Sequence, residues 1–428
     1  MKKIAKIQFL VLAAVSILLF SCKDKSYEEV NFTGNVPVYM NYDEFRASVK
    51  LKDAQEMVQT GKIYMKDEYL FINELYEGVH IINNSDPANP QNVGFISIPG
   101  NVDIAIKDKV LYADSYIDLV AIDISDLNNP VEIYRVENAF PNILPPTNIE
   151  YPVAPVDFSQ GVVVDWTIDD VTVKYEESYN YNPYVFYDEV LISPSDGFVN
   201  NESDKASVGT GGSLARFAIK DNTLLAINNG ISLKMFDISL PEQITSGDSI
   251  NIFTTIETLF TVDNNLFIGS TTGMFIYNIT NPNAPILISE YWHMTSCDPV
   301  VVQGDYAYIT LRTGTTCFGS VNELHVVDIS DIENPTLLKE YEMYNPYGLG
   351  IDDTTLFVCD GTAGLKIYNA ANPLTITDNE LAIYADINTY DVIPNNGILM
   401  MIGSEGLYQY DYSDLQNIQL LSFLPIGE

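Results

Sequence analysis

The side chains in this sequence that could do chemistry are mostly carboxylates. Histidine is scarce, because the 428 residues include 58 Asp and Glu but only His80, His293 and His325. Their spacing matches neither a histidine zinc motif nor a Ser–His or Cys–His pair. The Gly-rich stretch 209–212 lacks the strand-to-helix setting and the lysine of a phosphate loop. We therefore predict no bound metal, no cofactor and no histidine-based catalysis.

Carboxylates alone can hydrolyse glycosides when two of them stand at the right separation across a sugar. Five aspartates are candidates for such a pair, namely Asp103, Asp114, Asp298, Asp360 and Asp391. Acidic side chains also line propeller channels that have no activity, so the residue types do not decide between the two. The sequence leaves enzymatic activity open and favours a non-enzymatic role.

These candidates occupy fixed places in a repeat. A short apolar run, then Asp or Asn, then a turn rich in Ser, Asp and Asn recurs seven times at a period of roughly 40 residues. Asp and Asn side chains bond the backbone that follows them, and Pro cannot donate to a strand ladder. The phrase therefore ends one strand and begins another. Its copies begin at Ile82, Ile122, Phe236, Tyr277, Val327, Tyr368 and Tyr410.

Each copy is flanked by strands rich in β-branched and aromatic residues, two before the phrase and one after it. Four short strands per unit are typical of a propeller blade, and closing the units into a ring limits exposed sheet edges. We predict an all-β fold, a seven-bladed β-propeller of four-stranded blades, with a long insertion at 137–209 between blades two and three. His80 and His325 fall at equivalent positions in blades one and five, which favours structural roles.

The repeat resembles a known family. Strands such as Leu119-Val120-Ala121-Ile122-Asp123 and Leu324-His325-Val326-Val327-Asp328 resemble those of LVIVD-repeat proteins. Nearly all of the chain after residue 35 is similar to LVIVD-repeat β-propeller lipoproteins of the Bacteroidetes type. The resemblance implies the propeller fold, and it brings no catalytic motif that maps onto this sequence.

The first 21 residues are expected to be a lipoprotein signal peptide. Three lysines precede an apolar stretch too short to span a bilayer, and Leu19-Phe20-Ser21-Cys22 resembles a bacterial lipobox. Cys22 would carry the lipid, residues 22–35 would form a polar tether, and residues 36–428 would form the propeller domain. Lys23 directly after the cysteine favours the outer membrane, on its periplasmic or cell-surface side. The alternative is an ordinary secretory signal with a chance cysteine.

The formal net charge of −37 at pH 7 limits the partners. Such a surface repels nucleic acid and anionic lipid headgroups. We therefore expect no nucleic-acid partner and a membrane contact through the N-terminal lipid. The charge has two interpretations, solubility of an exported protein or attraction of Ca²⁺ or a cationic partner.

Three cysteines remain besides the one expected to carry lipid. Cys359 lies in an apolar strand and is expected to be a small buried residue. Cys297 and Cys317 occupy the innermost-strand start and the second-to-third-strand loop of blade five, which share a face. An oxidising compartment then favours a disulfide between them, and two free thiols are the alternative.

One face of the propeller is the predicted binding face. Loops joining the second and third strands lie on the same face as the starts of the innermost strands, and ligands usually meet that face. The candidate residues there are Glu74, Tyr76, Asp103, Asp114, Tyr116, Arg216, Asp298, Arg312, Tyr347, Asp360, Asp391 and Glu405. The insertion, with a strand pair around 162–166 and 171–175, is either a cap or mobile loop or a contact surface for protein or sugar.

The function that these features favour is that of a non-enzymatic, lipid-anchored envelope protein acting as a binding or scaffolding module. Its partner would be another envelope protein or a glycan. The alternatives are a glycan-binding or glycan-cleaving surface protein that uses channel-mouth carboxylates and tyrosines, and a purely structural envelope protein. The sequence leaves ring closure open, because residues 36–40 could add a strand to the last blade or cap an end. Residues 43–57 suggest a short helix.

Overall fold

The computed structural model describes residues 27–141, 143–176, 208, 210–213, 215–293, 299–313 and 321–427. Within these ranges the only helices are α2 (Tyr42–Arg46) and the short 3₁₀ helix η1 (Ile376–Asp378). Neither is long and apolar enough to cross a membrane. The helix expected over 43–57 is thus limited to one turn, with Asn41 as its N-cap. The chain forms two compact units, one from Met1–Val38, Thr147–Asp157 and Asp165–Asp188, and the other from the remainder.

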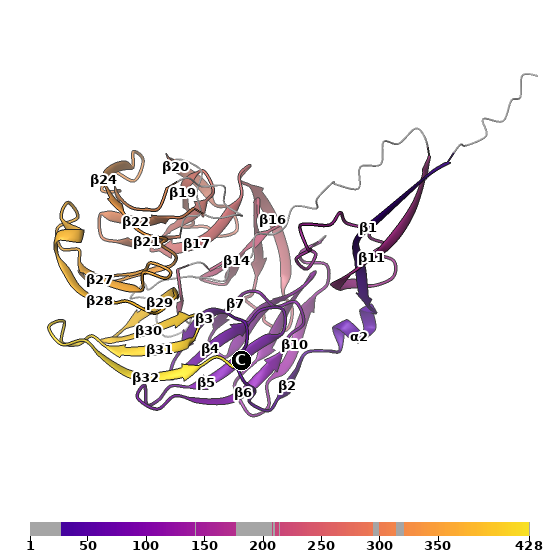
Figure 1. Cartoon of the computed structure of the whole chain (residues 1–428), viewed down its shortest axis with the longest axis horizontal. Coiled ribbons are helices and arrows are strands. Elements are labelled where there is room, and N and C mark those ends of the chain that lie inside the picture. The colour runs from indigo at the N-terminus through magenta and orange to yellow at the C-terminus, as the bar shows by residue number, and fades with distance from the viewer. Residues whose placement is uncertain are drawn as a thin grey trace, which may run out of the picture. The chain divides into compact units, whose positions relative to one another are not determined.

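The larger unit contains seven antiparallel blades, which confirms the predicted seven-bladed fold (Figure 1). Blade one has β3 (Thr60–Lys66), β4 (Tyr69–Glu74), β5 (Gly78–Asn83) and β6 (Gln91–Ser97), and blade two has β7 (Ile104–Lys107), β8 (Val110–Ser115), β9 (Asp118–Asp123) and β10 (Val131–Val136). Blade three has β13 (Phe217–Lys220), β14 (Thr223–Asn228), β15 (Ser232–Asp237) and β16 (Thr245–Asn251), and blade four has β17 (Ile256–Val262), β18 (Asn265–Ser270), β19 (Gly273–Asn278) and β20 (Ile286–Trp292).

The remaining blades repeat this order. Blade five has β21 (Val300–Gln303), β22 (Tyr306–Leu311), β23 (Glu323–Asp328) and β24 (Thr336–Glu342). Blade six has β25 (Leu349–Asp352), β26 (Thr355–Cys359), β27 (Leu365–Asn369) and β28 (Glu380–Tyr384). Blade seven has β29 (Thr389–Asn395), β30 (Ile398–Gly403), β31 (Gly406–Asp411) and β32 (Gln419–Pro425). Two short strands, β2 (Lys50–Lys52) and β12 (Thr210–Gly211), extend blade one at its two edges.

The repeated phrase forms the same turn in all seven blades. The side-chain oxygen of its Asp or Asn accepts a hydrogen bond from the backbone N–H two residues later, at 2.8–3.0 Å. This is the turn expected from the sequence, and it fixes where the third strand of each blade stops. The hairpin between the first two strands is also repeated. Its left-handed residue is Asp67, Asp108, Asp221, Asp263, Gly304, Asp353 or Asn396.

The core lies between neighbouring blades. One buried cluster combines Phe71 of blade one, Tyr112 of blade two and Phe236 of blade three, each at most 1% exposed. Large rings therefore fill the space between the faces of successive sheets, and truncating one would cost about 3–5 kcal/mol. This packing holds the blades rigidly, so that the loops at one end stand at fixed positions.

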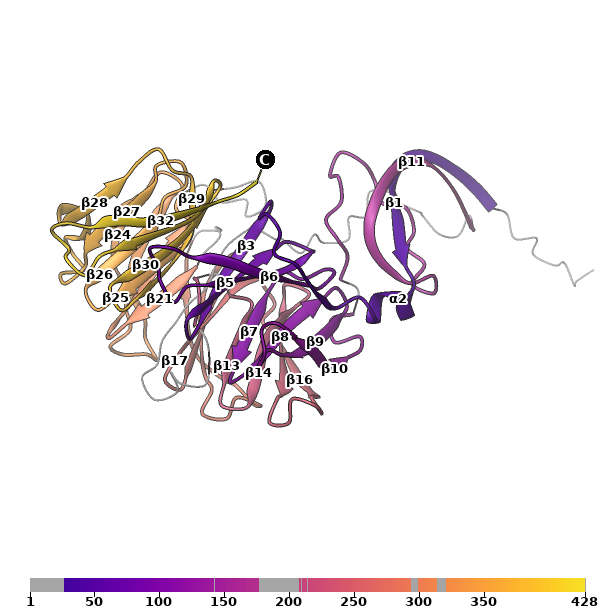
Figure 2. The same cartoon turned by 90° about the horizontal axis from the view of Figure 1, so that it is seen from below.

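The ring closes without a shared blade. Blade seven is built entirely from residues 389–425, and its inner strand β29 contacts β3 of blade one. Figures 1 and 2 show the yellow blade seven beside the indigo blade one. The sequence left open whether residues 36–40 add a strand to the last blade or cap an end. In the structure they belong to β1 (Tyr27–Met40), which does not join the last blade.

The smaller unit is built on a two-stranded sheet, in which β1 pairs with β11 (Val162–Glu176). The strand pair expected around 162–166 and 171–175 is therefore wrong, because both segments belong to one continuous strand. The buried Asn35 fastens this unit internally: its amide donates to the carbonyl oxygens of Asn148 at 2.9 Å and Tyr151 at 2.7 Å. Between β10 and β13 the described residues thus form β11 and β12, whereas residues 177–207 lie outside the described part.

Candidate functional site

A narrow crevice lies where the loops of blades one, two and three meet. Its empty volume is about 500 Å³ when the part open to solvent is counted, but the centres of water molecules can reach only about 30 Å³ of it. A slot of this kind suits one inserted side chain or a flat group better than a bulky ligand. The crevice is lined by Tyr76, Gly100, Val102, Asp114, Tyr116, Phe140, Ile143, Leu144, Arg216, Phe217 and Ile227.

Four of the residues predicted from the sequence, Tyr76, Asp114, Tyr116 and Arg216, line this crevice together. They come from three blades, as the argument from propeller topology required. The segment after β10 adds an apolar wall of Phe140, Ile143 and Leu144. These three belong to residues 137–209, so part of this segment lies at the predicted face.

Two tyrosines give the crevice its walls from equivalent turns. Tyr76 lies between β4 and β5 with φ of 65°, and Tyr116 lies between β8 and β9 with φ of 44°. A bulky residue rarely adopts a left-handed backbone, and such positions concentrate at ligand sites. The Tyr116 hydroxyl donates to the carbonyl oxygen of Val164 at 2.8 Å, which fixes its ring. Tyr76 is half-buried, and it packs against the apolar cluster that contains Tyr116 and Ile117.

Two charged residues, Asp114 and Arg216, line the crevice. Asp114 Oδ1 accepts hydrogen bonds from Asn101 Nδ2 and from the backbone N–H groups of Val102 and Asp103, at 2.8–3.0 Å. Burial raises the pKa of Asp114 to about 6, and Arg216 only partly offsets that rise. Burial also lowers the pKa of the Arg216 guanidinium, against the attraction of Asp114 and Asp103. The crevice therefore holds an acid whose pKa is raised to about 6 and a half-buried arginine.

Asp103 lies just behind the crevice and joins three blades. Its Oδ2 accepts from Lys62 Nζ of blade one at 3.0 Å and from the backbone N–H groups of Arg216 and Phe217 at blade three. Asp103 and Lys62 are both buried. Because a buried carboxylate must be paired and hydrogen-bonded, Asp103 acts as a structural tie that sets the spacing of the crevice walls.

A second group of predicted residues meets on the other side of the ring. The Arg312 guanidinium lies over the ring of Tyr347 at 4.1 Å from its centroid, and Tyr347 packs against Tyr390 with centroids 5.6 Å apart. Stacked arginine and tyrosine are typical of interface anchors. This group brings blades five, six and seven together.

Three more predicted residues serve their own blades. Glu74 is buried and accepts from the backbone N–H groups of Val58 and Gln59 and contacts His80 Nε2 at 3.0 Å. Burial favours a raised pKa for Glu74, but these hydrogen bonds outweigh it and the pKa is lowered. Asp360 is fully buried, accepts from the backbone of Tyr344 and Asn345, and pairs with Lys366. Glu405 is exposed and accepts from the Tyr408 hydroxyl at 2.6 Å.

Asp391 occupies the inner strand of blade seven. It is fully buried, its Oδ1 accepts from the backbone N–H of Ser213 at 3.1 Å, and its Oδ2 has no hydrogen-bond partner among the described residues. Burial raises the pKa of Asp391 well above the ordinary value. A Cβ at Gly212 would lie 1.6 Å from Oδ2, so only glycine fits beside it. The neutral acid is therefore the form that this site accommodates.

Some predicted residues lie outside the described part of the chain. These are Asp298, the expected disulfide partners Cys297 and Cys317, and the expected lipidation site Cys22. Cys359 is described, and it is a fully buried cysteine in β26, as expected.

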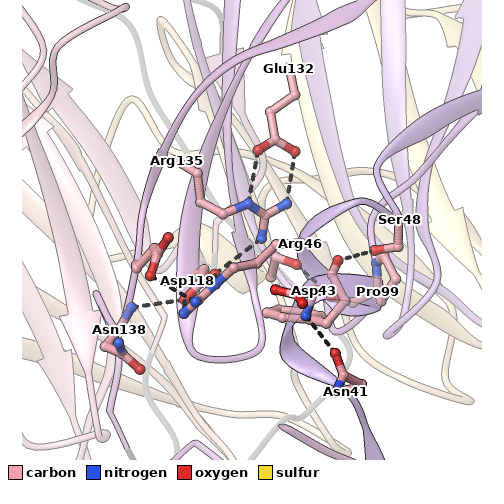
Figure 3. Close-up of polar contacts among 12 residues, drawn as sticks. Asn41, Asp43, Arg46, Ser48, Pro99, Asp118, Glu132, Arg135 and Asn138 are labelled. Atoms are coloured by element: carbon pink, nitrogen blue, oxygen red, sulfur yellow. Dashed lines mark hydrogen bonds and ion pairs between the residues drawn. The ribbon is translucent and has the colours of Figure 1, made fainter. Parts of the chain in front are cut away.

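A polar network that the sequence does not predict lies at the outer edge of blade two, and Figure 3 shows it. The fully buried Asp118 accepts from Arg46 Nε at 3.0 Å, from Arg135 Nη1 at 3.3 Å and from the backbone N–H of Asn138 at 2.8 Å. Arg135 also forms a bidentate pair with Glu132, at 2.8 and 2.7 Å. The network fastens α2 and the segment after β10 to the blade. No sequence pattern signals it, because Arg46 arrives from outside the repeat.

Comparison with known proteins supports the repeat and the fold. The LVIVD repeat model matches residues 100–138 and 296–343, which correspond to blades two and five. A solved protein from Lactobacillus plantarum is similar in fold, with a TM-score of 0.52 and 10% identity over 86% of this chain and 98% of that one. The computationally designed Ika8 protein gives a TM-score of 0.49 and 11% identity, covering 86% and 88% of the two chains.

BamB from Moraxella catarrhalis gives a TM-score of 0.45 and 12% identity, covering 85% of this chain and 96% of that one. No curated protein matches the sequence. The similarity to the Lactobacillus plantarum protein, at 10% identity, shows the fold alone. The chain is a seven-bladed, all-β propeller that carries LVIVD repeats.

Proposed function

We propose that this protein is a non-enzymatic binding or scaffolding module whose partner docks on the face that carries the crevice. The observation that carries this proposal is the convergence of Tyr76, Tyr116 and Arg216 from three blades on one narrow slot. Tyrosine and arginine are the residues that dominate binding energy at interfaces, because both present a large, rigid contact surface with a polar end.

The shape of the slot supports a macromolecular partner. The crevice is narrow and lined mostly by apolar and aromatic side chains, so it has room for little more than one side chain of a partner. One side chain from a partner, inserted beside the two tyrosines, would meet apolar walls and the charged side chains of Asp114 and Arg216. A single anchored side chain surrounded by a polar rim is how many protein interfaces are organised.

The hydrogen bonds of the carboxylates favour binding over hydrolysis. Asp103 and Asp360 each accept hydrogen bonds from backbone N–H groups and from one lysine. Asp114 Oδ1 accepts hydrogen bonds from two backbone N–H groups. A general acid and a nucleophile must instead face the substrate. These aspartates fasten loops, and the loops in turn position the tyrosines.

The cellular setting of the proposal rests on the sequence. An export signal ending at Cys22 would give a lipid-anchored protein of the outer membrane, on its periplasmic or cell-surface side. The partner would then be another envelope protein, and the strongly acidic surface disfavours nucleic acid. A rigid propeller anchored by an N-terminal lipid would present its face to partners in the same membrane.

The test compares two tyrosines at opposite ends of one strand pair. Tyr76→Ser removes a wall of the crevice, and Tyr69→Ser removes a half-buried tyrosine at the other end of β4 and β5. Affinity purification of the cross-linked protein from its native envelope would recover a stoichiometric partner with the wild type and with Tyr69→Ser. Tyr76→Ser would lose it. Equal recovery with both variants would refute the assignment of this face.

A glycan is the second candidate ligand, because the crevice combines tyrosine rings with an acid whose pKa is about 6. Sugars stack on aromatic rings, and their hydroxyl groups donate hydrogen bonds to carboxylates. A glycan array would show binding that Tyr76→Ser abolishes and Tyr69→Ser preserves. If binding were unaffected by Tyr76→Ser, the sugar would bind elsewhere and this candidate would fail.

A further inference from the structure

A cluster of metal-binding side chains lies on blade five, away from the crevice. One ligand atom from each of Glu323, His325 and Glu340 lies within 4.8 Å of the others. His325 Nε2 is 2.8 Å from Glu323 Oε2 and 4.0 Å from Glu340 Oε1. Tetrahedral coordination at ordinary zinc–ligand lengths separates ligand atoms by about 3.4 Å. The observed distances bracket that value, so a small shift of two glutamates would complete the geometry.

The strand register explains why these three side chains meet. Glu323 and His325 are two residues apart on β23 and therefore point to the same face of the sheet. Glu340 on β24 is the direct cross-strand neighbour of His325. The histidine side chain is 5% exposed, whereas those of Glu323 and Glu340 are 27% and 55% exposed. A buried imidazole with two carboxylates above it forms a site that opens to solvent on one side.

A hydrogen bond holds the imidazole in the orientation that a metal would need. The Tyr291 hydroxyl lies 2.9 Å from His325 Nδ1, on the opposite side of the ring from the glutamates. Without metal, the 2.8 Å contact with the Glu323 carboxylate requires a proton on Nε2, and Nδ1 then accepts from the Tyr291 hydroxyl. Metal binding at Nε2 would place the ring proton on Nδ1, and the Tyr291 hydroxyl can accept a hydrogen bond from Nδ1–H. A second imidazole, that of His293, stands edge-on to His325 with ring centroids 6.2 Å apart.

The equivalent position in blade one lacks this arrangement. His80 occupies the place of His325, but its cross-strand neighbour is Phe95 and the residue two before it is Gly78. The His80 ring packs against Phe95 with centroids 4.8 Å apart, and its one carboxylate partner, Glu74, is already bonded to backbone N–H groups. Blade one therefore has a histidine at this position without two free carboxylates beside it, whereas blade five adds Glu323 and Glu340 around His325.

We propose that Glu323, His325 and Glu340 bind a divalent transition metal ion of the Zn²⁺ type. Two carboxylates balance the charge of a divalent cation, and the imidazole selects Zn²⁺-like metals over Ca²⁺ and Mg²⁺, which prefer oxygen ligands alone. Water or His293 would supply the fourth ligand. The strongly acidic surface raises the local concentration of cations around the site.

The test measures Zn²⁺ binding to the chelator-stripped full chain by competition with a chromophoric chelator. Excess Ca²⁺ and Mg²⁺ are added so that they occupy acidic side chains that bind any divalent cation. The informative variant is Glu340→Gln, because its exposed side chain is not needed for folding. The matched control is Glu290→Gln, since Glu290 occupies the same position on β20 of blade four, opposite Phe275 instead of a histidine.

The expected result is one Zn²⁺ site per chain that Ca²⁺ does not displace. Its Kd rises more than about tenfold in Glu340→Gln and in His325→Asn, and stays within about twofold in Glu290→Gln. Thermal unfolding with and without Zn²⁺ provides a second readout, because a metal that binds only the folded state raises Tm. No such site in the wild type, or an equal loss in Glu290→Gln and Glu340→Gln, would overturn the proposal. If His325→Asn failed to fold, the two glutamate variants would still decide it.

Discussion

Asn84 and Gln409, which are 325 residues apart in the chain, exchange two hydrogen bonds across the junction of the first and last blades. The Asn84 amide donates to Gln409 Oε1 at 2.9 Å, and the Gln409 amide donates to Asn84 Oδ1 at 2.6 Å. Ser422 adds a third contact by donating to the carbonyl oxygen of Pro87 at 2.6 Å. Because no blade is shared between the two ends of the chain, these polar contacts join the packed faces in closing the ring.

We expect Gln409→Leu to lower the free energy of unfolding by about 2 kcal/mol, because it leaves the Asn84 amide without its partner in a partly buried place. Denaturant unfolding measures the change. The control is Gln416→Leu, at an exposed turn of the same blade, which should have little effect. Adding Asn84→Leu to Gln409→Leu should cost less than the two single changes combined, and full additivity would contradict the pairing.

A second prediction concerns the contribution of Asp118, at the outer edge of blade two, to stability. Asp118→Asn removes the charge that two arginines share, while Arg46 keeps Glu137 and Arg135 keeps Glu132. We expect a loss of about 3 kcal/mol in the free energy of unfolding and faster hydrogen exchange in α2. Glu137→Gln removes an exposed partner of the same Arg46 and should cost less than about 1 kcal/mol. Equal losses in the two variants would contradict the central role of Asp118.

The raised pKa of Asp114 in the crevice predicts that the free energy of unfolding depends on pH. Its pKa is about 6 in the folded protein against an ordinary value of 3.8, so folding favours its protonated form. The resulting stabilisation is present below about pH 4 and is lost as the pH rises through 6. Asp114→Asn keeps the acceptor oxygen and does not titrate. We expect the wild type to lose up to about 3 kcal/mol relative to this variant between pH 4 and pH 7, measured by denaturant unfolding. A difference that is constant with pH would show that Asp114 titrates normally.

The aspartates of the repeated turn phrase predict a pH dependence of stability with the opposite sign. Hydrogen bonds from the serine two residues later lower the pKa values of Asp123, Asp237, Asp328 and Asp411. Their stabilisation is present above the ordinary pKa and is lost as the pH falls through the lowered values. Asn already occupies this place in three blades, at 83, 278 and 369. Replacing all four aspartates by Asn should leave Tm unchanged at pH 7 and flatten its decline below pH 4. An unchanged acid decline would contradict this assignment.

The repeat made much of the fold predictable. The phrase around Asp123 carries its own turn chemistry, so the strand ends, the blade count and the face that holds the loops follow from local sequence. Tyr76, Asp114, Tyr116 and Arg216 could be placed together because topology alone assigns them to neighbouring loops. The same reasoning correctly predicted that Cys359 is buried.

The structural role of each carboxylate could not be predicted from the sequence. Asp103 and Asp114 look alike in the sequence, but one joins three blades through Lys62 and backbone N–H groups while the other faces the crevice. The Asp118 network and the pairing of β1 with β11 depend on segments outside the repeat. The cluster around His325 depends on cross-strand register, which relates Glu340 to His325 only once the blade is formed.

The central claim is that a partner meets the crevice face, and site-specific photo-crosslinking tests it most directly. A photoreactive amino acid would replace Tyr76 in one version of the full-length protein and Tyr69, at the other end of the same strand pair, in the second. After irradiation of intact cells, the account predicts a discrete cross-linked species from position 76 and none from position 69. Cross-links of equal yield from both positions, or from neither, would contradict it.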